Sequence, residues 1–140
     1  MQIGLVSCTK SKLDKAAPPK ELYTESSYFR KMREYSETYH GDWYILSAKH
    51  HLLEPDGTTI EPYEESLTEA YVDERREWAR ETASQLREQR VLSDADVLVI
   101  HAGKKYYEEL IPLLEDDVDI EIPTEGLGFG ETLSWYNEHI

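Results

Sequence analysis

The chain of 140 residues contains a single cysteine, Cys8, so no disulfide can form within it. One unpaired thiol suits a reducing compartment. No apolar run approaches the roughly 20 residues that a membrane-spanning helix needs. No basic region precedes the first apolar segment, so we expect no secretory signal peptide. These absences predict a cytoplasmic protein without a membrane partner.

Positive charge is also scarce. The sequence has 29 aspartates and glutamates against 15 lysines and arginines, which gives a formal net charge of -14 at pH 7. Non-specific wrapping of duplex DNA needs a broad basic face, and this composition disfavours one. We expect most of the carboxylates to form a solvated acidic surface. Any basic site must therefore be local.

Apolar segments alternate with segments of helical periodicity, and the length suits one compact domain over residues 1–140. The predicted strands are 2–7, 43–47, 97–100 and 118–122, and the predicted helices are 26–39, 68–90, 104–114 and 131–138. Prolines and polar residues make 8–24 and 48–67 predicted loops. The alternation predicts an α/β fold: a single three-layer domain with a mostly parallel central sheet of about four strands.

Three predicted strands end in a small polar turn that carries lysine. The first, second and third lysine turns are Ser7-Cys8-Thr9-Lys10-Ser11-Lys12, Ser47-Ala48-Lys49-His50 and His101-Ala102-Gly103-Lys104-Lys105. In an open α/β sheet, ligands bind outside the carboxyl ends of the strands. Lysines placed there in such an acidic chain predict an anionic ligand, either a small molecule or a nucleic-acid-derived group such as a nucleotide.

The first lysine turn offers two kinds of chemistry. Ser7, Thr9 and the backbone amides can hold an oxyanion, while Lys10 and Lys12 add positive charge. The turn lacks the Gly-x-x-x-x-Gly-Lys spacing of a phosphate-binding P-loop. Cys8 is a candidate nucleophile, because the nearby lysines favour a thiolate and a histidine at position 50 or 51 could act as its base. The alternative is that this cysteine only fills space at the strand end.

The second lysine turn contributes Ser47, Lys49 and His50 as candidate binding residues. Two adjacent histidines without a spaced third ligand are weak grounds for a metal site, so we expect no metal and no cofactor. Further along, Glu61 could accept hydrogen bonds from a base edge, and Tyr63 could stack or donate. The alternative is a loop that Tyr63 anchors against the core.

The third lysine turn and a glycine-rich loop complete the candidate site. Gly103 and Lys104 are candidate binding residues, although this turn could simply begin a helix. In the loop Glu125-Gly126-Leu127-Gly128-Phe129-Gly130, Gly126 and Gly128 permit close backbone approach to a ligand, and Glu125 is an acid–base candidate. The spacing differs from Gly-x-Gly-x-x-Gly, so no dinucleotide fingerprint is predicted. The alternative is a turn before the last helix.

Several of these motifs, in this order and spacing, resemble a family of small bacterial, archaeal and phage domains of unknown function. The resemblance extends from about Ile3 to Tyr136. The residues that carry it include Leu5-Val6-Ser7-Cys8-Thr9-Lys10-Ser11-Lys12, Trp43-Tyr44-Ile45-Leu46-Ser47-Ala48-Lys49, Ile60-Glu61-Pro62-Tyr63, Ala102-Gly103-Lys104-Lys105-Tyr106 and Pro123-Thr124-Glu125-Gly126-Leu127-Gly128. The chain departs from the pattern at His50-His51, where relatives usually have an aromatic residue followed by glycine.

The family is distantly similar to the uracil-DNA-glycosylase-like domain attached to archaeal tRNA-guanine transglycosylases and archaeosine synthase. Some relatives belong to 7-deazaguanine DNA-modification clusters, in which a nitrile-bearing base is converted to an amide. The resemblance therefore implies a uracil-DNA-glycosylase-like fold and chemistry on a base or nucleotide.

These observations favour an enzyme that acts on a nucleobase, a nucleotide or a 7-deazaguanine-type base by hydrolysis or related chemistry. Lysines of the first two turns would neutralise phosphate or a developing oxyanion. Cys8, Glu61 or Glu125 would act as nucleophile, acid or base. We expect the first two lysine turns to build the pocket. The alternatives are a non-catalytic nucleotide- or nucleic-acid-binding module and a protein-interaction domain whose lysine turns point apart; the oligomeric state stays open.

Overall fold

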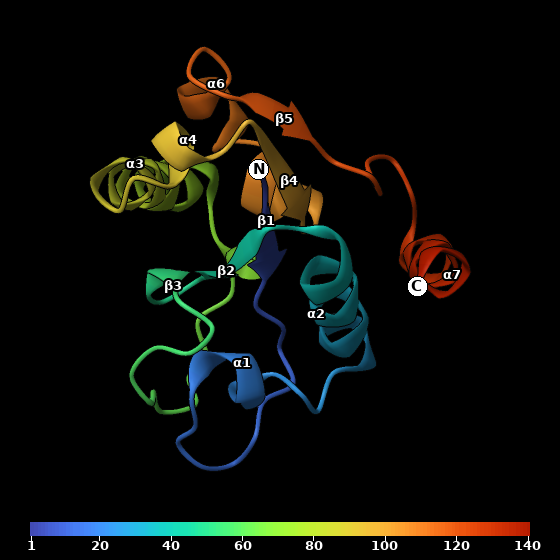
Figure 1. Cartoon of the computed structure of the whole chain (residues 1–140). Coiled ribbons are helices and arrows are strands. Elements are labelled where there is room, and N and C mark those ends of the chain that lie inside the picture. The colour runs from blue at the N-terminus through green and yellow to red at the C-terminus, as the bar shows by residue number, and fades with distance from the viewer.

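A computed structural model describes all 140 residues and contains a five-stranded sheet in the order β3-β2-β1-β4-β5 (Figure 1). The strands are β1 (Gln2–Ser7), β2 (Asp42–Ser47), β3 (His51–Leu53), β4 (Val97–His101) and β5 (Asp119–Glu121). β1 pairs in parallel with both β2 and β4, β5 pairs in parallel with β4, and β3 pairs antiparallel with β2. The predicted α/β class and the parallel central strands are confirmed.

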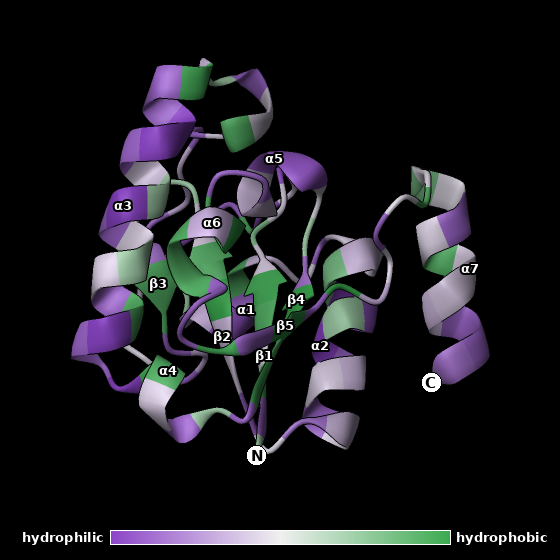
Figure 2. Ribbon diagram, turned by 90° about the horizontal axis from the view of Figure 1, so that it is seen from above, coloured by the Kyte–Doolittle hydropathy of each residue, from purple (hydrophilic) through white to green (hydrophobic).

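Helices lie on both faces of this sheet. They are α1 (Pro19–Leu22), α2 (Ser27–Tyr39), the 3-10 helix η1 (Leu67–Glu69), α3 (Val72–Glu88), α4 (Val91–Asp94), α5 (Lys104–Tyr107), α6 (Ile111–Leu114) and α7 (Phe129–His139). α2 and α7 cover one face, and α3 with α4 covers the other, while hydrophobic residues concentrate in the strands between them (Figure 2). None of the helices combines the length and apolar character needed to cross a bilayer.

The prediction of about four strands misses β3, which adds an antiparallel edge. The chain reverses after β2 because His51 adopts a left-handed conformation with φ of 69°. Glycine takes that conformation at little cost, whereas histidine does so at a cost of order 1 kcal/mol. The tight turn therefore forms although histidine occupies it. A strand of three residues is too short to show the alternation by which a strand is predicted.

Two predicted helices are each divided. The segment 68–90 becomes η1 and α3, because Ser66 caps the first and Glu74 accepts a hydrogen bond from the Tyr71 amide at the start of the second. The segment 104–114 becomes α5 and α6, since Pro112 in the first turn of α6 has no N–H to continue a helix from before it. The predicted loop 8–24 contains α1, which begins at Pro19, a favoured first helical residue.

Gly4 sets how closely α2 can approach the sheet. A β-carbon at this position would lie 2.6 Å from Cδ2 of His40 and 3.2 Å from Oγ of Ser36. Both contacts are shorter than ordinary van der Waals distances. The lack of a side chain on β1 therefore allows the end of α2 to lie directly over the strand.

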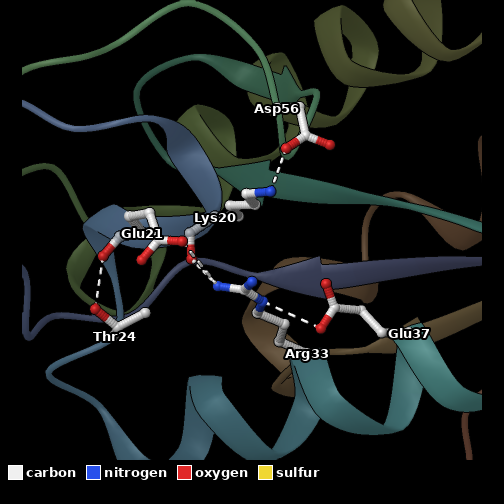
Figure 3. Close-up of polar contacts among 6 residues, drawn as sticks. All are labelled: Lys20, Glu21, Thr24, Arg33, Glu37 and Asp56. Carbon is white, nitrogen blue, oxygen red and sulfur yellow. Dashed lines mark hydrogen bonds and ion pairs between the residues drawn. The ribbon is translucent and has the colours of Figure 1, made fainter.

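Polar contacts fasten α1 to its surroundings (Figure 3). Arg33 of α2 donates to the Lys20 carbonyl oxygen at 2.9 Å and pairs with Glu37 at 3.3 Å. Lys20 pairs with Asp56, and Thr24 donates to the Glu21 carbonyl oxygen at 2.7 Å. Exposed ion pairs contribute little free energy singly. Together these contacts connect the segment after β1 with α2 and with the 54–57 turn.

A chain of hydrogen bonds ties α7 to the sheet through two histidines. The Tyr136 hydroxyl lies 2.6 Å from Nδ1 of the fully buried His101, whose Nε2 lies 2.8 Å from Nε2 of His40. Nδ1 of His40 lies 3.2 Å from the side-chain oxygen of Gln2. One proton assignment satisfies all three bonds: Tyr136 donates to His101, which donates to His40, which donates to Gln2. Both imidazoles are then neutral.

This chain predicts that stability falls in mild acid. Burial lowers the pKa of His101 to about 3, and burial lowers the pKa of His40 below its ordinary value. The unfolded chain therefore binds protons that the native protein does not, so unfolding becomes easier as pH falls below about 6.5. Between about pH 7.5 and 5.5, His101 alone should remove about 1.4 kcal/mol from the free energy of unfolding.

Urea denaturation at several pH values measures this effect. The His101→Asn variant can still accept the Tyr136 hydrogen bond, and it should be less stable at neutral pH but lose less stability on acidification. The exposed His139 takes no part in the hydrogen bonds between Tyr136, His101, His40 and Gln2. His139→Gln should therefore retain the wild-type pH dependence. Equal slopes for the wild type and His101→Asn would contradict this account.

Candidate functional site

A cavity of about 750 Å³ lies at the carboxyl ends of β1 and β4. Its walls come from residues 7–11 after β1, residues 25–28 at the start of α2, residues 103–106 after β4, Leu127, Phe129 and Thr132 at the start of α7, and Ser66 and Thr68 beside η1. This volume suits a small organic ligand. The cavity therefore draws on five segments that are far apart in the sequence.

The strand order accounts for the position of this cavity. The chain leaves β1 toward α2 on one face of the sheet, and it leaves β4 toward α5 and α6, of which α6 contacts α3 on the other face. Because neighbouring strands send their connections to opposite faces, a crevice opens between the two strand ends. Ligands bind at such topological switch points in open α/β sheets.

Positive charge converges on this cavity. Lys10, Lys104 and Lys105 line it, against one carboxylate, that of Glu25. The first turn of α2 also faces it and contains no acidic residue, and Glu25, just before the N-cap Ser26, is the one carboxylate beside the positive end of that helix dipole. In a chain of net charge -14, this is a local reversal of sign that favours an anion.

Aromatic side chains form part of the same cavity. The rings of Tyr28 and Phe129 lie 5.7 Å apart between centroids, and the Phe129 side chain is 70% exposed at the rim. Tyr106 is buried and also lines the cavity. Exposed aromatic faces can stack on planar rings. The cavity thus combines groups for an anion with groups for a planar aromatic moiety.

Cys8 also lines the cavity and is 5% exposed. Its Sγ lies 3.3 Å from the Tyr106 hydroxyl, and its amide donates to the Leu46 carbonyl oxygen at 2.8 Å. Burial raises the pKa of Tyr106, so this phenol is protonated at neutral pH and can donate a hydrogen bond. The position suits a nucleophile, but no histidine lines the cavity to act as its base.

The second lysine turn serves a different purpose. Ser47 is fully buried, and its Oγ accepts from the His50 amide at 3.0 Å and lies 2.7 Å from the Tyr63 hydroxyl. That hydroxyl lies 2.6 Å from the hydroxyl of Tyr23, and Trp78 donates to the Ser47 carbonyl oxygen at 2.8 Å. No residue of the second turn lines the cavity, and its Ala48 lines a separate hollow beside η1 and α3.

Lys12 lies behind the first lysine turn and does not line the cavity. Its Nζ donates to the carbonyl oxygens of Thr9 at 2.9 Å and Lys10 at 3.3 Å. The same atom lies 4.5 Å from the centroid of the Tyr63 ring, a cation–π contact. Burial lowers the pKa of Lys12. Its charge is therefore directed at the backbone of the turn and at an aromatic ring.

The structure brings together part of the predicted site and separates the rest. The predicted site residues that line the cavity are Ser7, Cys8, Thr9, Lys10, Gly103 and Lys104. Those that do not line it are Ser47, Lys49, His50, Glu61, Tyr63, Glu125, Gly126 and Gly128. Glu125 lies in another hollow beside β5. Gly126 adopts φ of 82°, which lets the loop turn so that Leu127 and Phe129 reach the cavity rim. The cavity thus joins the first and third lysine turns, whereas the sequence predicts a pocket built by the first and second.

Seven lining residues have no motif that marks them in the sequence as site residues: Glu25, Ser26, Ser27, Tyr28, Ser66, Thr68 and Thr132. Tyr28 has the spacing of a helix-face residue, and that interpretation concealed its second role. Phe129 lies between two glycines of the glycine-rich loop. That position was the signal in the sequence that could have marked it as a site residue. Only the arrangement of the strands shows that these segments meet.

The buried hydroxyl network predicts a large cost for Ser47→Ala. The substitution removes one of the two hydroxyl partners of Tyr63 and the only acceptor of the His50 amide, which should lower the free energy of unfolding by about 1–3 kcal/mol. Ser134→Ala, at an exposed position of α7, should change it by less than about 0.5 kcal/mol. Urea denaturation of both variants measures the difference. Equal stabilities would show that the network contributes nothing.

Comparison with known proteins agrees with the extent of the motifs. Residues 3–138 match the model of a family of unknown function, DUF6884. The uncharacterized protein YfjM of Bacillus subtilis (strain 168) is 27% identical over 139 residues, covering 91% of this chain and 89% of that protein. No solved structure matches the chain. Because the family model spans nearly its full length, the chain belongs to the DUF6884 family.

Proposed function

We propose that this protein is an enzyme that acts on a nucleobase, nucleotide or 7-deazaguanine-type base in the cavity between the ends of β1 and β4. One observation carries the proposal. Three lysines and three aromatic residues line a single cavity of about 750 Å³, at a topological switch point of a chain with net charge -14. A nucleotide combines an anionic group with a planar aromatic ring, which is what this lining accommodates.

The lining suggests how such a ligand is oriented. Lys10, Lys104 and Lys105 provide charge for a phosphate, and the first turn of α2 adds its dipole. Tyr28 and Phe129 provide ring faces near the rim for the base. The parallel strands and the helices on both faces are compatible with the uracil-DNA-glycosylase-like fold that the sequence resemblance implies, and we propose that fold relationship with the function.

Cys8 is the candidate for the chemical step, because it is the only one of the three proposed catalytic residues in the cavity. Its thiolate would add to an electrophilic carbon of the base that is double- or triple-bonded to oxygen or nitrogen. The π bond would break, and its electron pair would move to that oxygen or nitrogen, which then takes up a proton. The neighbouring lysines would stabilise the thiolate and the negative charge that develops in the transition state. Tyr106 could donate a proton, since its hydroxyl lies 3.3 Å from the sulfur.

A specific observation favours a second candidate, a non-catalytic nucleotide-binding module. No histidine lines the cavity, and Glu25 is its only carboxylate. A nucleophilic cysteine ordinarily needs an adjacent base. In this alternative the lysines and aromatic residues bind the ligand, and Cys8 only closes the bottom of the cavity.

The lysines of the cavity give the most direct test of binding. Lys104→Ala should weaken binding of a nucleoside 5′-monophosphate about tenfold or more, because it removes a charged hydrogen-bond donor worth about 1.5–3 kcal/mol. Isothermal titration of a panel of such nucleotides measures the effect. The exposed Lys49 lies outside the cavity, so Lys49→Ala is the matched control and should bind like the wild type. Equal losses in both variants would place the ligand elsewhere.

Replacing the thiol separates the two candidate functions. Cys8→Ala should bind the nucleotide within about threefold of the wild type, since neutral contacts contribute less than charged ones, but should lose turnover of the same ligand. Product analysis by mass spectrometry measures turnover with nucleotides and 7-deazaguanine bases. Turnover retained by Cys8→Ala would remove the thiol from the mechanism. A wild type that binds but never converts any of these ligands would support the binding module.

A further inference from the structure

Lys12 determines the orientation of two peptide groups in the first lysine turn. Its Nζ donates to the carbonyl oxygens of Thr9 and Lys10, which belong to consecutive peptide units. A peptide group is planar and trans, so its N–H points opposite to its C=O. Both carbonyls point to Lys12, and therefore the N–H groups of Lys10 and Ser11 point away from it, to the same side.

These two amides have no acceptor within the protein. Neither the Lys10 nor the Ser11 N–H takes part in a backbone hydrogen bond, and neither donates to a side chain. Lys10 and Ser11 both line the cavity, whereas Lys12 does not. We infer that the side opposite Lys12 is the side of the cavity. Successive backbone amides that point into one concave space form a binding place for anions.

The charges around this turn agree with that orientation. Lys10, Lys104 and Lys105 line the cavity, so an anion at the two amides would lie among three cations. The Lys12 ammonium group is held back by two carbonyl oxygens and by the Tyr63 ring, at 4.5 Å from its centroid. Its contribution to an anion would come through the peptide groups that it orients.

We propose that the Lys10 and Ser11 amides form an oxyanion-binding site for the phosphate group of the ligand, and that Lys12 is the positioning residue that holds them in place. This inference rests on the proposed function in so far as it takes the anion to be the phosphate of a nucleotide. The inference goes beyond the proposed function in two ways. It assigns phosphate recognition to the backbone of the first lysine turn, and it gives Lys12 a role without ligand contact.

Amide-resolved NMR of the whole chain tests the site with inorganic phosphate as the probe. In the wild type, the Lys10 and Ser11 amide protons should move downfield and saturate, because each gains a hydrogen bond to a charged oxygen. Nucleoside 5′-monophosphate should produce the same two shifts together with changes at Tyr28 and Phe129. The corresponding nucleoside, which lacks the phosphate, should leave the Lys10 and Ser11 amides unchanged.

Variants of Lys12 test the positioning role. Lys12→Met retains a similar volume but cannot hold the two carbonyls, so phosphate affinity should fall about tenfold and the two downfield shifts should disappear. Lys12→Arg retains charged donors and should restore much of both. Lys49→Met is the matched control and should behave like the wild type. A Lys12→Met variant that still shows both shifts at full affinity would overturn the positioning role.

The outcomes distinguish this inference from the proposed function. Phosphate or nucleotide that shifts resonances of Tyr28, Lys104 and Lys105 but leaves the Lys10 and Ser11 amides unmoved would overturn the oxyanion site and leave the proposed function standing. A wild type in which no cavity resonance responds to phosphate or to any nucleotide would overturn both. The wild-type titration decides these points even if a Lys12 variant were to unfold.

Discussion

The parallel pairing of β1 with both of its neighbours is the constraint on which the rest of this structure depends. Residues 3–7 of the strand are buried between β2 and β4 and beneath helices on both faces. The carboxyl end of β1 must therefore emerge between two other strand ends, where the connections leave to opposite faces. Gly4 lets the C-terminal end of α2 lie close over the strand, while the first turn of that helix lines the cavity at the carboxyl end of β1. The cavity follows from the topology.

The two sides of β1 then differ in what occupies the space above the strand ends. On the β2 side, Ser47, Tyr63 and Tyr23 form a buried hydroxyl network. On the β4 side the space stays open and is lined by lysines and aromatic rings. Lys12 lies at the boundary, in contact with the Tyr63 ring and with the carbonyls of the cavity turn. The packed half of the strand ends thus supports the open half, and the half-buried Lys12 connects them.

Much of the fold could be predicted because strands and helices leave periodic signals in the sequence. β1, β2 and β4 read as apolar runs, and Ser26 marks the start of α2. The β3 hairpin could not be predicted, because it depends on His51 adopting the left-handed conformation, which is typical of glycine and not of histidine. The site was predicted as a set of strand-end turns. Which turns share a cavity depends on long-range contacts, such as that between Ser47 and Tyr63, that carry no local signal.

The central claim is that an anionic, nucleotide-like ligand binds between the ends of β1 and β4. A crystal structure of the protein grown with a nucleoside 5′-monophosphate tests it most directly. The account predicts the phosphate beside residues 10 and 11 with Lys104 in contact, and the base near Tyr28 and Phe129. A ligand bound above β2 or elsewhere on the surface would contradict it, as would a cavity that stays empty when the ligand is present at saturating concentration.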